Sequence, residues 1–477
     1  MNLNQYVRKL FGVMFQSRQT QQVIRVLPRH SPTSLKEWCQ YWQAKGFPWR
    51  TEPEIDEKRQ EELSKCRTIV PDIEKGIYPF KGMKLSRADV EWLLATHEGG
   101  KGPIDWKDQN QRKREGLDLR GADLREVNLS RLPLARLRGG TSLFVRVSSK
   151  AHQDASVVTM EYVDLSEAQL QGANLEAALL QHAEFYGADL EEANLSEAQL
   201  EGASFHRAFL EHVNFTYAKL ENADLSEALL YSANLSMAHL KEVSLRGAVL
   251  ENVSLREAQL ENVDLKGVDL ANDKHVGPYI ADAIWEGINL TVVEWSQVKI
   301  LGDEYVARQS QDRGGRKKDK ETRLDEYEAA VRANRQLAVV LEDQGLNEDA
   351  ARFAYRAQVL QRHALWRQRN FWKWLGSAIL ALLAGYGYRM WRILAAYLLV
   401  VLLCTVAYFV LGMYYEPHLS FLEALLTSIT AFHGRVFSEP FLRPGEPQLW
   451  VTAFEAVAGL VIEGVFIAML AQKFFGK

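Results

Sequence analysis

A five-residue period runs without a gap from Glu161 to Leu270. Leu or Phe occupies every fifth position from Leu165 onward, which makes 22 consecutive repeats. Ala or Val stands two residues earlier in most repeats, as at Val163 and Ala168. Neither the 3.6-residue period of an α-helix nor the two-residue period of a β-strand accounts for this spacing. The period therefore indicates a repetitive fold.

Each repeat is predicted to be a short extended piece followed by a turn. The small residue and the Leu are two positions apart, so both point to the same side of an extended chain, and the polar residue between them, such as Asp189, points to the other side. The remaining pair, such as Gln171–Gly172 or Tyr186–Gly187, provides the turn. Such repeats wind into a solenoid with an interior of stacked Leu and small residues, which is stable only when its coils stack.

The pattern resembles the pentapeptide-repeat family, whose signature is A-(D/N)-L-x-x and which GADLEEANL at 187–195 fits closely. The resemblance implies a right-handed quadrilateral β-helix with about four repeats per coil. An earlier run of Leu at the same spacing is out of register with the main block. We therefore expect a first solenoid coil at 116–134, an insertion at 135–160 and the main pentapeptide-repeat β-helix at 161–300, which passes through an irregular stretch at 272–278.

The segments on either side of the repeats are predicted to be helical in part. In the N-terminal region 1–115, Ser86 is an N-cap for a short amphipathic helix that we expect to cover the open end of the solenoid. Residues 301–324 read as a basic linker, and residues 325–368 as a helical hairpin with Asn347 available to cap its second helix. This hairpin resembles one tetratricopeptide-type unit, for which a spacer or a subunit contact is favoured over a peptide receptor.

Two long apolar segments near the C-terminus predict membrane spans. Residues 393–415 carry no charge over 23 residues, which is long enough for about 30 Å of hydrocarbon. Residues 449–472 are similar except for Glu455 and Glu463. Basic residues precede the first segment and follow the second, so the positive-inside rule places both termini in the cytoplasm and residues 416–448 outside. We therefore expect a multi-pass protein of the inner (plasma) membrane with cytoplasmic repeats.

The segment before the first span is apolar but short. The run FWKWLGSAILALLAGYG is too short to cross a bilayer comfortably, so we expect an interfacial helix at 371–392. A third span is the alternative. Residues 393–477 then comprise a transmembrane helix, a short helix with a loop, and a second transmembrane helix.

The order of these elements resembles that of two-transmembrane, pore-loop ion channels, which are tetrameric. Aligned with the T-V-G-Y-G-D filter of that family, this chain offers a filter-like loop at Thr430, Ala431, Phe432, His433, Gly434 and Arg435. Thr430 and Gly434 agree with the family, whereas Phe432 replaces a glycine and Arg435 replaces an acid. The potassium-filter chemistry of backbone carbonyl rings therefore does not carry over.

Glu455 and Glu463 call for an explanation, because an ionised Glu inside a membrane costs several kcal/mol unless it meets water or a partner. In a tetrameric pore, Glu463 would form a ring in a water-filled cavity and Glu455 would pair with Arg435 behind the loop. In the alternative, both are protonated or hydrogen-bonded between the helices of a non-conducting assembly. His433 is either part of a pH-responsive ring or a plain polar loop residue, and the second reading is favoured.

Charge and cysteine content restrict the partners. The chain has 57 basic and 61 acidic residues overall, but residues 161–270 have 6 Lys/Arg against 20 Asp/Glu. This local field repels nucleic acid, so no nucleic acid is expected, and it favours a basic protein partner on the solenoid. Cys39, Cys66 and Cys404 are widely separated, so neither a disulfide framework nor a zinc site is indicated, and we expect no cofactor and no metal.

Two function classes follow, and both are non-enzymatic because no nucleophile elbow, phosphate loop or paired carboxylates stand in a recognisable frame. The leading hypothesis is an integral membrane ion-channel-like homo-oligomer, tetrameric if it forms a pore, with a cytoplasmic sensing or docking solenoid. The alternative is a membrane-anchored, non-conducting scaffold for protein–protein interaction. Some pentapeptide-repeat proteins mimic DNA and bind DNA gyrase, which would suit the acidic block, although a membrane tether argues against that role.

Overall fold

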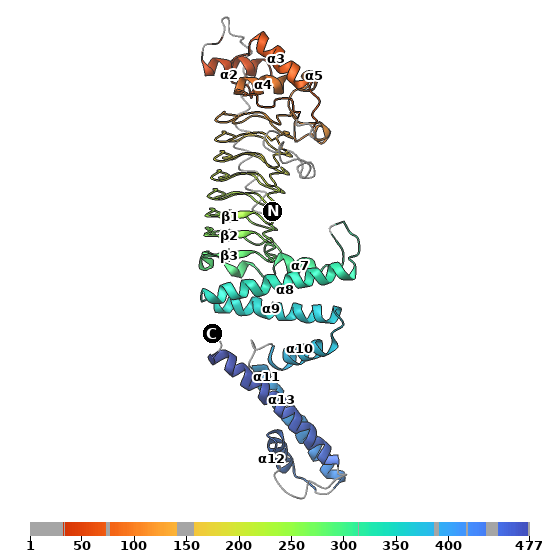
Figure 1. Cartoon of the computed structure of the whole chain (residues 1–477). Helices are drawn as coiled ribbons and strands as arrows, with labels where there is room; N and C mark the ends of the chain where they lie inside the picture. Colours follow the sequence, from red (N-terminus) through yellow and green to blue (C-terminus); the bar gives the residue numbers. More distant parts are fainter. Residues whose placement is uncertain are drawn as a thin grey trace. The chain divides into compact units, whose positions relative to one another are not determined.

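The computed structural model describes residues 32, 34–72, 77–140, 157–312, 314–385, 391–415, 418–435 and 447–475. The chain divides into two compact units, Met1–Ala233 and Asn234–Lys477, which are described separately below. Figure 1 labels the helices and strands along the chain.

Stacked coils of the repeat form most of the first unit. Parallel backbone bridges join residues that lie twenty positions apart, for example Asp164 to Glu184 and Asp189 to Phe209. Each coil therefore contains four five-residue repeats. Leu or Phe at every fifth position is buried inside the coils, and Phe185 stacks on Phe205 with ring centroids 4.6 Å apart. The predicted pentapeptide solenoid is confirmed.

The turns between repeats have a left-handed residue at a fixed position. Gly172 and Gly187 have φ of 62° and 60°, and non-glycine residues at the equivalent position, such as Glu192, adopt the same conformation. This conformation is strained for an L-residue, so glycine relieves the turn where it occurs. The pairs predicted to turn the chain, Gln171–Gly172 and Tyr186–Gly187, do so.

The expected insertion at 135–160 is too wide. Arg138 pairs with Asp118 as part of a coil, and Thr159 pairs with both Asp123 and Leu179. The coil therefore continues to Gly140 and resumes at Val157, and the residues between them lie outside the described chain. Sixteen intervening residues are one more than three repeats, which explains why the two blocks are out of register in the sequence although coils from both stack within the first unit.

Short helices cover the N-terminal end of the first unit. They are α2 (Leu35–Ala44), α3 (Glu57–Arg67), α4 (Arg87–Ala95) and α5 (His97–Gly100), followed by the 3₁₀ helix η1 (Gln111–Lys113). The predicted N-cap is confirmed: Ser86 and Asp89 form a capping box at the start of α4. Backbone bridging between Lys84 and Asp123 attaches this region to the first coil.

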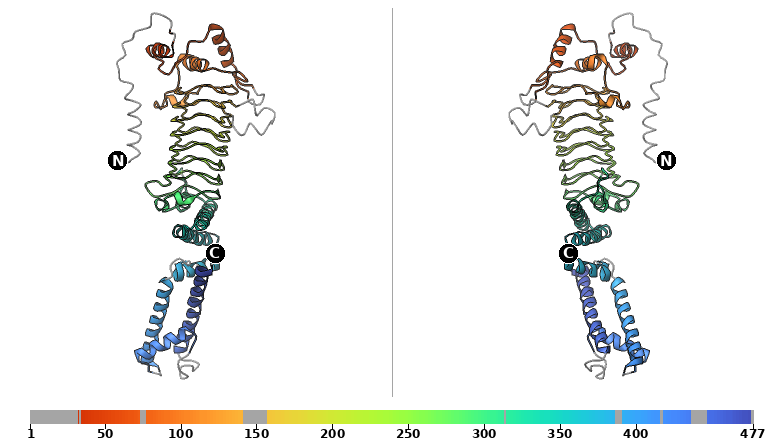
Figure 2. Two further views of the ribbon diagram at one scale, coloured as in Figure 1. Left: turned by 90° about the vertical axis from the view of Figure 1, so that its left-hand side faces the viewer. Right: turned by 90° about the vertical axis from the view of Figure 1, so that its right-hand side faces the viewer.

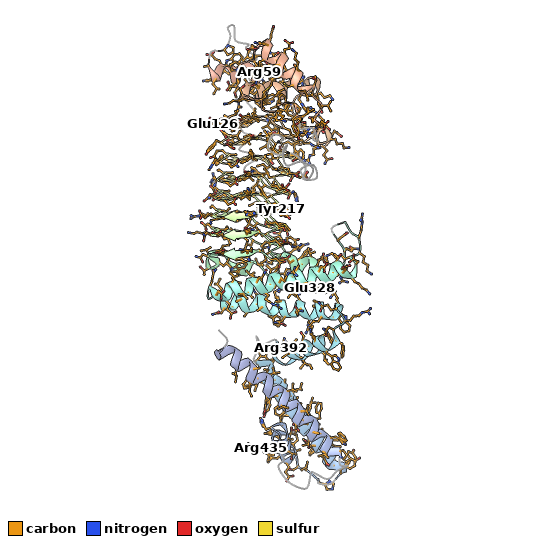
Figure 3. The ribbon with its side chains drawn as sticks, in the orientation of Figure 1. Arg59, Glu126, Tyr217, Glu328, Arg392 and Arg435 are labelled. Atoms are coloured by element: carbon orange, nitrogen blue, oxygen red, sulfur yellow. The ribbon has the colours of Figure 1, made fainter. Side chains whose placement is uncertain are left out.

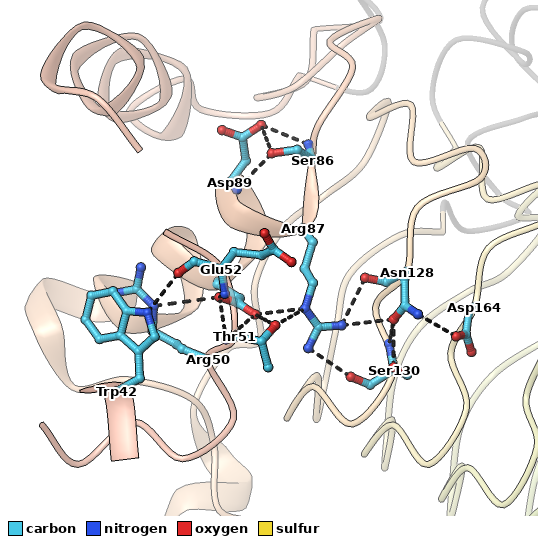
Figure 4. A network of polar contacts seen from close by, with 11 residues as sticks. Trp42, Arg50, Thr51, Glu52, Ser86, Arg87, Asp89, Asn128, Ser130 and Asp164 are labelled. Atoms are coloured by element: carbon cyan, nitrogen blue, oxygen red, sulfur yellow. Dashed lines mark hydrogen bonds and ion pairs between the residues drawn. The ribbon is translucent and has the colours of Figure 1, made fainter. Parts of the chain in front are cut away.

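A polar network around a buried carboxylate links α4 to the first coil, and Figure 4 shows Arg87 of this network reaching Asn128 and Ser130. Glu91 is fully buried and accepts hydrogen bonds from the backbone N–H groups of Thr51 and Glu52 at 2.9 and 3.0 Å. It also pairs with Arg87 at 2.8 Å, and Arg87 donates in turn to Asn128 at 3.0 Å. The charge of Glu91 is thus compensated by a set of donors that reaches from the cap into the solenoid.

Asp89 adds a pH-sensitive contact to the same helix. Burial alone would raise the pKa of Asp89, but hydrogen bonds from Arg59 and Ser86 outweigh burial and hold that pKa below its usual range. The stabilisation is therefore present above the unfolded-state pKa of about 3.9 and is lost as the pH falls through the folded-state value.

The second unit begins with further coils and a small parallel sheet. Its strands are β1 (His239–Lys241), β2 (Gln259–Glu261) and β3 (Ile284–Glu286), in the order β1-β2-β3. Gln259 pairs with His239, twenty positions before it, and with Ile284, twenty-five positions after it. The irregular stretch at 272–278 therefore lengthens one coil by five residues without changing which side chains face inward.

The expected linker at 301–324 is structured over much of its length. After the 3₁₀ helices η3 (Leu290–Val292) and η4 (Trp295–Gln297), helix α7 (Gly302–Arg308) buries Asp303, which accepts hydrogen bonds from Arg256 at 2.8 Å and from the backbone of Ile280 at 2.7 Å. Gln311 and Lys317 form an antiparallel bridge. The charged residues of 301–324 suggested a flexible linker, but Asp303 is held by hydrogen-bond donors from the coils.

The predicted helical hairpin consists of α8 (Lys320–Asp343) and α9 (Asn347–Arg367), which pack along each other. Leu346, not Asn347, is the N-cap residue of α9, and no side chain caps it. Gln344 bonds the backbone of both Ile288 and Leu290, and Arg352 donates to the carbonyl of Trp295. The hairpin therefore covers the C-terminal end of the coils in this unit.

Four apolar helices complete the second unit. They are α10 (Phe371–Ala384), α11 (Trp391–Tyr414), α12 (Phe421–Phe432) and α13 (Pro447–Phe475). Helices α11 and α13 lie side by side, and the shorter α12 packs against both (Figure 2).

Candidate functional site

Helices α11 and α13 present broad apolar faces. Trp391–Tyr414 and Pro447–Ala468 are long and apolar enough to cross a membrane. Large apolar side chains are exposed on both, including Leu394, Leu398, Leu402, Trp450, Phe454, Val457 and Leu460. Contiguous exposed apolar surface of this kind marks a protein or membrane contact.

Helix α12 fits between the two long helices through its apolar side chains. Phe432 is buried in a cluster with Ile393, Val401 and Ile462, and Ala424 is buried in a second cluster with Cys404 and Tyr408. A capping box of Ser420 and Glu423 begins the helix. The short helix is therefore held by both of its neighbours.

Gly459 permits the closest approach of α12 to α13. A Cβ atom at this position would lie 1.9 Å from the carbonyl oxygen of Phe432, whereas a Cβ at Gly464 on the same helix would meet nothing within 4 Å. Glycine at 459 thus has a packing role that glycine at 464 lacks within one chain.

Helices α11, α12 and α13 together are called the helical module below. We expect Gly459→Ala to destabilise this module by about 1–3 kcal/mol, because the added methyl group must push α12 away from α13. Gly464→Ala is the matched control and should be neutral or slightly stabilising, because Ala is the better helix former. Thermal unfolding of the two purified variants in detergent checks the difference. Equal melting temperatures would contradict the packing assigned to Gly459.

Polar side chains gather inside the module at the level of Glu455. Glu455 is fully buried, and its Oε1 accepts a hydrogen bond from the Ser428 hydroxyl. Ser428 is also 3.0 Å from the carbonyl oxygen of Val401, and the Tyr408 and Thr452 hydroxyls are 3.0 Å apart. The expected pairing of Glu455 with Arg435 is wrong, because Glu455 faces α11 and α12 inside the module and its partner is Ser428.

The filter-like residues do not form an extended strand. Thr430, Ala431 and Phe432 lie within α12, and His433 is the residue that ends it. The carbonyl of Ala431 accepts from the N–H of Gly434 at 2.9 Å, and that of Thr430 accepts from the N–H of Arg435 at 2.8 Å. Since these carbonyls close a helical turn, they are not aligned toward an ion, in agreement with the departure from the filter sequence.

His433 and Glu463 meet at the end of the short helix. The His433 Nδ1 contacts Glu463 Oε1, and both side chains are about half exposed, at 47% and 43%. Arg435, labelled in Figure 3, is exposed at the last described position of this segment. Each of these residues was predicted as a site residue, but the pairing of His433 with Glu463 was not.

Sequence reasoning missed several polar residues that the structure places inside the module, among them Tyr408, Ser428, Gln448 and Thr452. A signal was present. Gln448, Thr452, Glu455 and Gly459 are spaced four, three and four positions apart, which puts them on one face of α13. Polar and small residues at helical spacing within an apolar run are typical of helix–helix contacts in membranes.

In the part of the chain that the structure describes, no three His, Cys, Asp or Glu side chains gather in a group able to hold a metal ion. Among these residues, Cys39 and Cys66 are partly buried, Cys404 is buried, and all three are free thiols.

Comparison with known families identifies the repeats. Residues 160–196, 193–230 and 233–272 match the pentapeptide repeats, in eight copies. The chain therefore contains pentapeptide repeats, and the resemblance inferred from the sequence is confirmed for this part. A search of curated protein sequences finds no match.

Several solved structures are similar to this chain, and all three described here are pentapeptide repeat proteins. HetL, involved in heterocyst differentiation regulation in the cyanobacterium Nostoc sp. strain PCC 7120, is 21% identical; the match covers 42% of this chain and 79% of HetL, with a TM-score of 0.22. Rfr23 from the cyanobacterium Cyanothece 51142 is 28% identical, with 37% and 92% covered and a TM-score of 0.11. A protein from the Arabidopsis thaliana thylakoid lumen is 29% identical, with 24% and 68% covered and a TM-score of 0.13.

Proposed function

We propose that this chain is an ion-channel-like integral membrane protein, in which α11 and α13 cross the bilayer, α12 is a pore-helix-like element, and the pentapeptide solenoid is a cytoplasmic sensing or docking domain. The observation that carries the proposal is the packing of a short capped helix against two long apolar helices, with His433 and Glu463 at its end. Recording of current from the purified full chain in planar bilayers tests it.

Burial within the module supports insertion into a membrane. The side chains that face away from the α11–α12–α13 contacts are mostly apolar, while buried polar groups such as Ser428 and Glu455 bond one another. This inside-out distribution suits hydrocarbon surroundings, in which polar groups need internal partners. Among the described residues, the buried Glu455 Oε2 and Gln448 Nε2 atoms have no hydrogen-bond partner. Glu463, His433, Glu423 and Arg435 are among the exceptions, since all four are substantially exposed, and an oligomer with a water-filled axis would hydrate Glu463 and Arg435.

A non-conducting, membrane-anchored scaffold is the second candidate. Glu455, hydrogen-bonded between helices, favours it, because this residue serves packing and not an aqueous cavity. The acidic residues of 161–270 and exposed aromatic residues such as Tyr162 and Tyr217, the second of which is labelled in Figure 3, offer a surface for a basic protein partner. In this account the helices anchor the solenoid and carry no current.

The proposed topology predicts a labelling pattern in intact cells. In a background with Cys39 and Cys66 replaced by Ser, His418→Cys, between the two spans, should react with an impermeant thiol reagent. Ser310→Cys, at an exposed position between α7 and α8, should react only after the cells are permeabilised. Residue 438, in the same expected outside loop, lies beyond the described residues. Labelling of Ser310→Cys in intact cells would overturn a cytoplasmic solenoid.

A further inference from the structure

A large basic pocket lies where α8 begins, α9 ends and α10 begins. Its volume is about 960 Å³. Four of its lining residues are cationic: Lys320, Arg323, Arg367 and Arg369. Among the lining residues that the structure describes there is no carboxylate. A pocket of this size and charge fits an anion as large as a phosphorylated headgroup.

The cations of this pocket have no carboxylate partner among the described side chains, although Arg367 already donates to the carbonyl oxygen of His363 at 3.1 Å and lies over the Tyr327 ring. None of the four is within ion-pair distance of a carboxylate among the described side chains, and Arg323 Nε is buried without a hydrogen-bond partner. Neighbouring acids are engaged elsewhere: Glu326 accepts from Lys318 at 2.7 Å and Glu328 from Gln368 at 2.9 Å. The charge of Arg323 is therefore not neutralised by a described carboxylate, and an anionic oxygen at the accessible part of its side chain would neutralise it.

Backbone groups reinforce this preference for an anion. Lys320 and Arg323 belong to the first turn of the 24-residue α8, and Asn370 and Phe371 stand at the start of the 14-residue α10. Asn370 is the N-cap residue of α10, but its side chain accepts no hydrogen bond from the first N–H groups of that helix. The positive end of the α10 dipole, which no side chain caps, therefore borders a pocket that four cationic side chains already line. The start of α8 is different, because the Asp319 carboxylate already caps it, and the last turn of α9 also lines the pocket.

Aromatic residues give the rim of the pocket an interfacial character. Trp366 and Phe371 line it and are more than half exposed, and the next residue, Trp372, is 79% exposed. The Trp366 and Trp374 rings lie 4.9 Å apart. Helix α10 continues with exposed Ile379 and Leu382 and contacts α11 and α13. Tryptophan beside cations at the entry to a membrane segment is typical of the headgroup layer.

We propose that this pocket binds the phosphate of an anionic phospholipid headgroup, whose acyl chains lie along the exposed apolar face of α10. The inference rests on the proposed membrane insertion of α11 and α13. Phosphate is the chemistry recognised, and a lipid is favoured over a free phosphate because the cations and the exposed aromatic rim occur together. The bound lipid joins the end of the helical hairpin to the first membrane-associated helix.

Native mass spectrometry of the full chain in neutral detergent tests the proposal. Phosphatidylglycerol should bind at least about tenfold more tightly than phosphatidylcholine, which corresponds to about 1.4 kcal/mol. Arg323→Gln should remove most of this preference. Arg335→Gln is the control, since Arg335 is exposed on the same helix outside the pocket lining and the substitution removes the same charge.

Two further experiments are needed. The first distinguishes a lipid phosphate from free phosphate, and the second distinguishes membrane insertion from lipid binding in the pocket. Displacement of phosphatidylglycerol by millimolar inorganic phosphate would overturn the lipid assignment, as would equal affinity for both lipids or equal losses in the two variants. Carbonate extraction of cell membranes reports on insertion alone. A chain released into the soluble fraction would refute membrane insertion, whereas a chain retained in the membrane without lipid selectivity would refute only the pocket assignment.

Discussion

Leu200→Asn should unfold the repeat, with a loss of about 4 kcal/mol. Leu200 has no exposed surface and belongs to the column of Leu and Phe that fills the coils. The substitution removes roughly 2–3 kcal/mol of apolar burial and leaves an amide without partners, which costs about 1–3 kcal/mol more. Because each coil is stable only against its neighbours, the damage should spread along the stack. Circular dichroism during thermal and urea unfolding of the purified chain measures the loss.

The matched control is Lys219→Asn, which introduces the same side chain on the outside of the next coil. The Lys219 carbonyl oxygen accepts from the Leu200 N–H at 2.8 Å, so the two positions share one backbone contact. Since the Lys219 side chain is exposed, its replacement should change stability by about 0.5 kcal/mol or less. Similar losses in the two variants would contradict the division of each repeat into inward and outward positions.

The repeat was predictable because one short pattern fixes the direction of every side chain. Burial of Leu165 and Ala168, outward placement of Asp189 and the turn at Gly172 all follow from a five-residue period. The boundary at 135–160 was not, because Arg138 and Thr159 belong to coils although neither fits the leucine pattern. Their place is set by backbone bridges to distant residues, and a local pattern carries no information on such bridges.

The linker at 301–324 and the cap at α4 show the same limit. Ser86 was found because a helix cap acts within four residues. Asp303 and Glu91 were not singled out, because a buried carboxylate is recognised only by its donors. Arg256 is 47 residues from Asp303 in sequence, and Thr51 is 40 residues from Glu91. A charged stretch therefore reads as a solvated linker until the fold brings those donors to it.

Candidate site residues were identified from the sequence individually, but their partners were not. An acid in an apolar run, such as Glu455 or Glu463, stands out by composition alone. The packing of α12 decides whether such an acid faces a neighbouring helix or the axis of an oligomer. In this structure the Phe432 side chain of α12 is buried inside the module, and its backbone lies against Gly459 of α13. The pairing of His433 with Glu463 across thirty residues follows from that packing.

Charge at the end of α12 should govern current if the proposed function is right. In an oligomer, copies of Glu463 would surround a common axis, where a low dielectric strengthens each charge, so Glu463→Gln should lower cation current several-fold. Arg435→Asp, at the outer mouth, should raise it. Both side chains are substantially exposed within one chain, so melting temperatures should change little.

Glu455→Gln separates this account from the scaffold, because it makes the same chemical change at the buried carboxylate that bonds Ser428. In a channel, Glu455→Gln should alter melting more than current, while Glu463→Gln should alter current more than melting. In a scaffold no variant conducts, and both substitutions change only the stability of the assembly. Planar-bilayer recording and thermal melting of the three variants therefore distinguish the two functions: absence of current throughout, with a lower melting temperature for Glu463→Gln, would leave the anchored scaffold as the function.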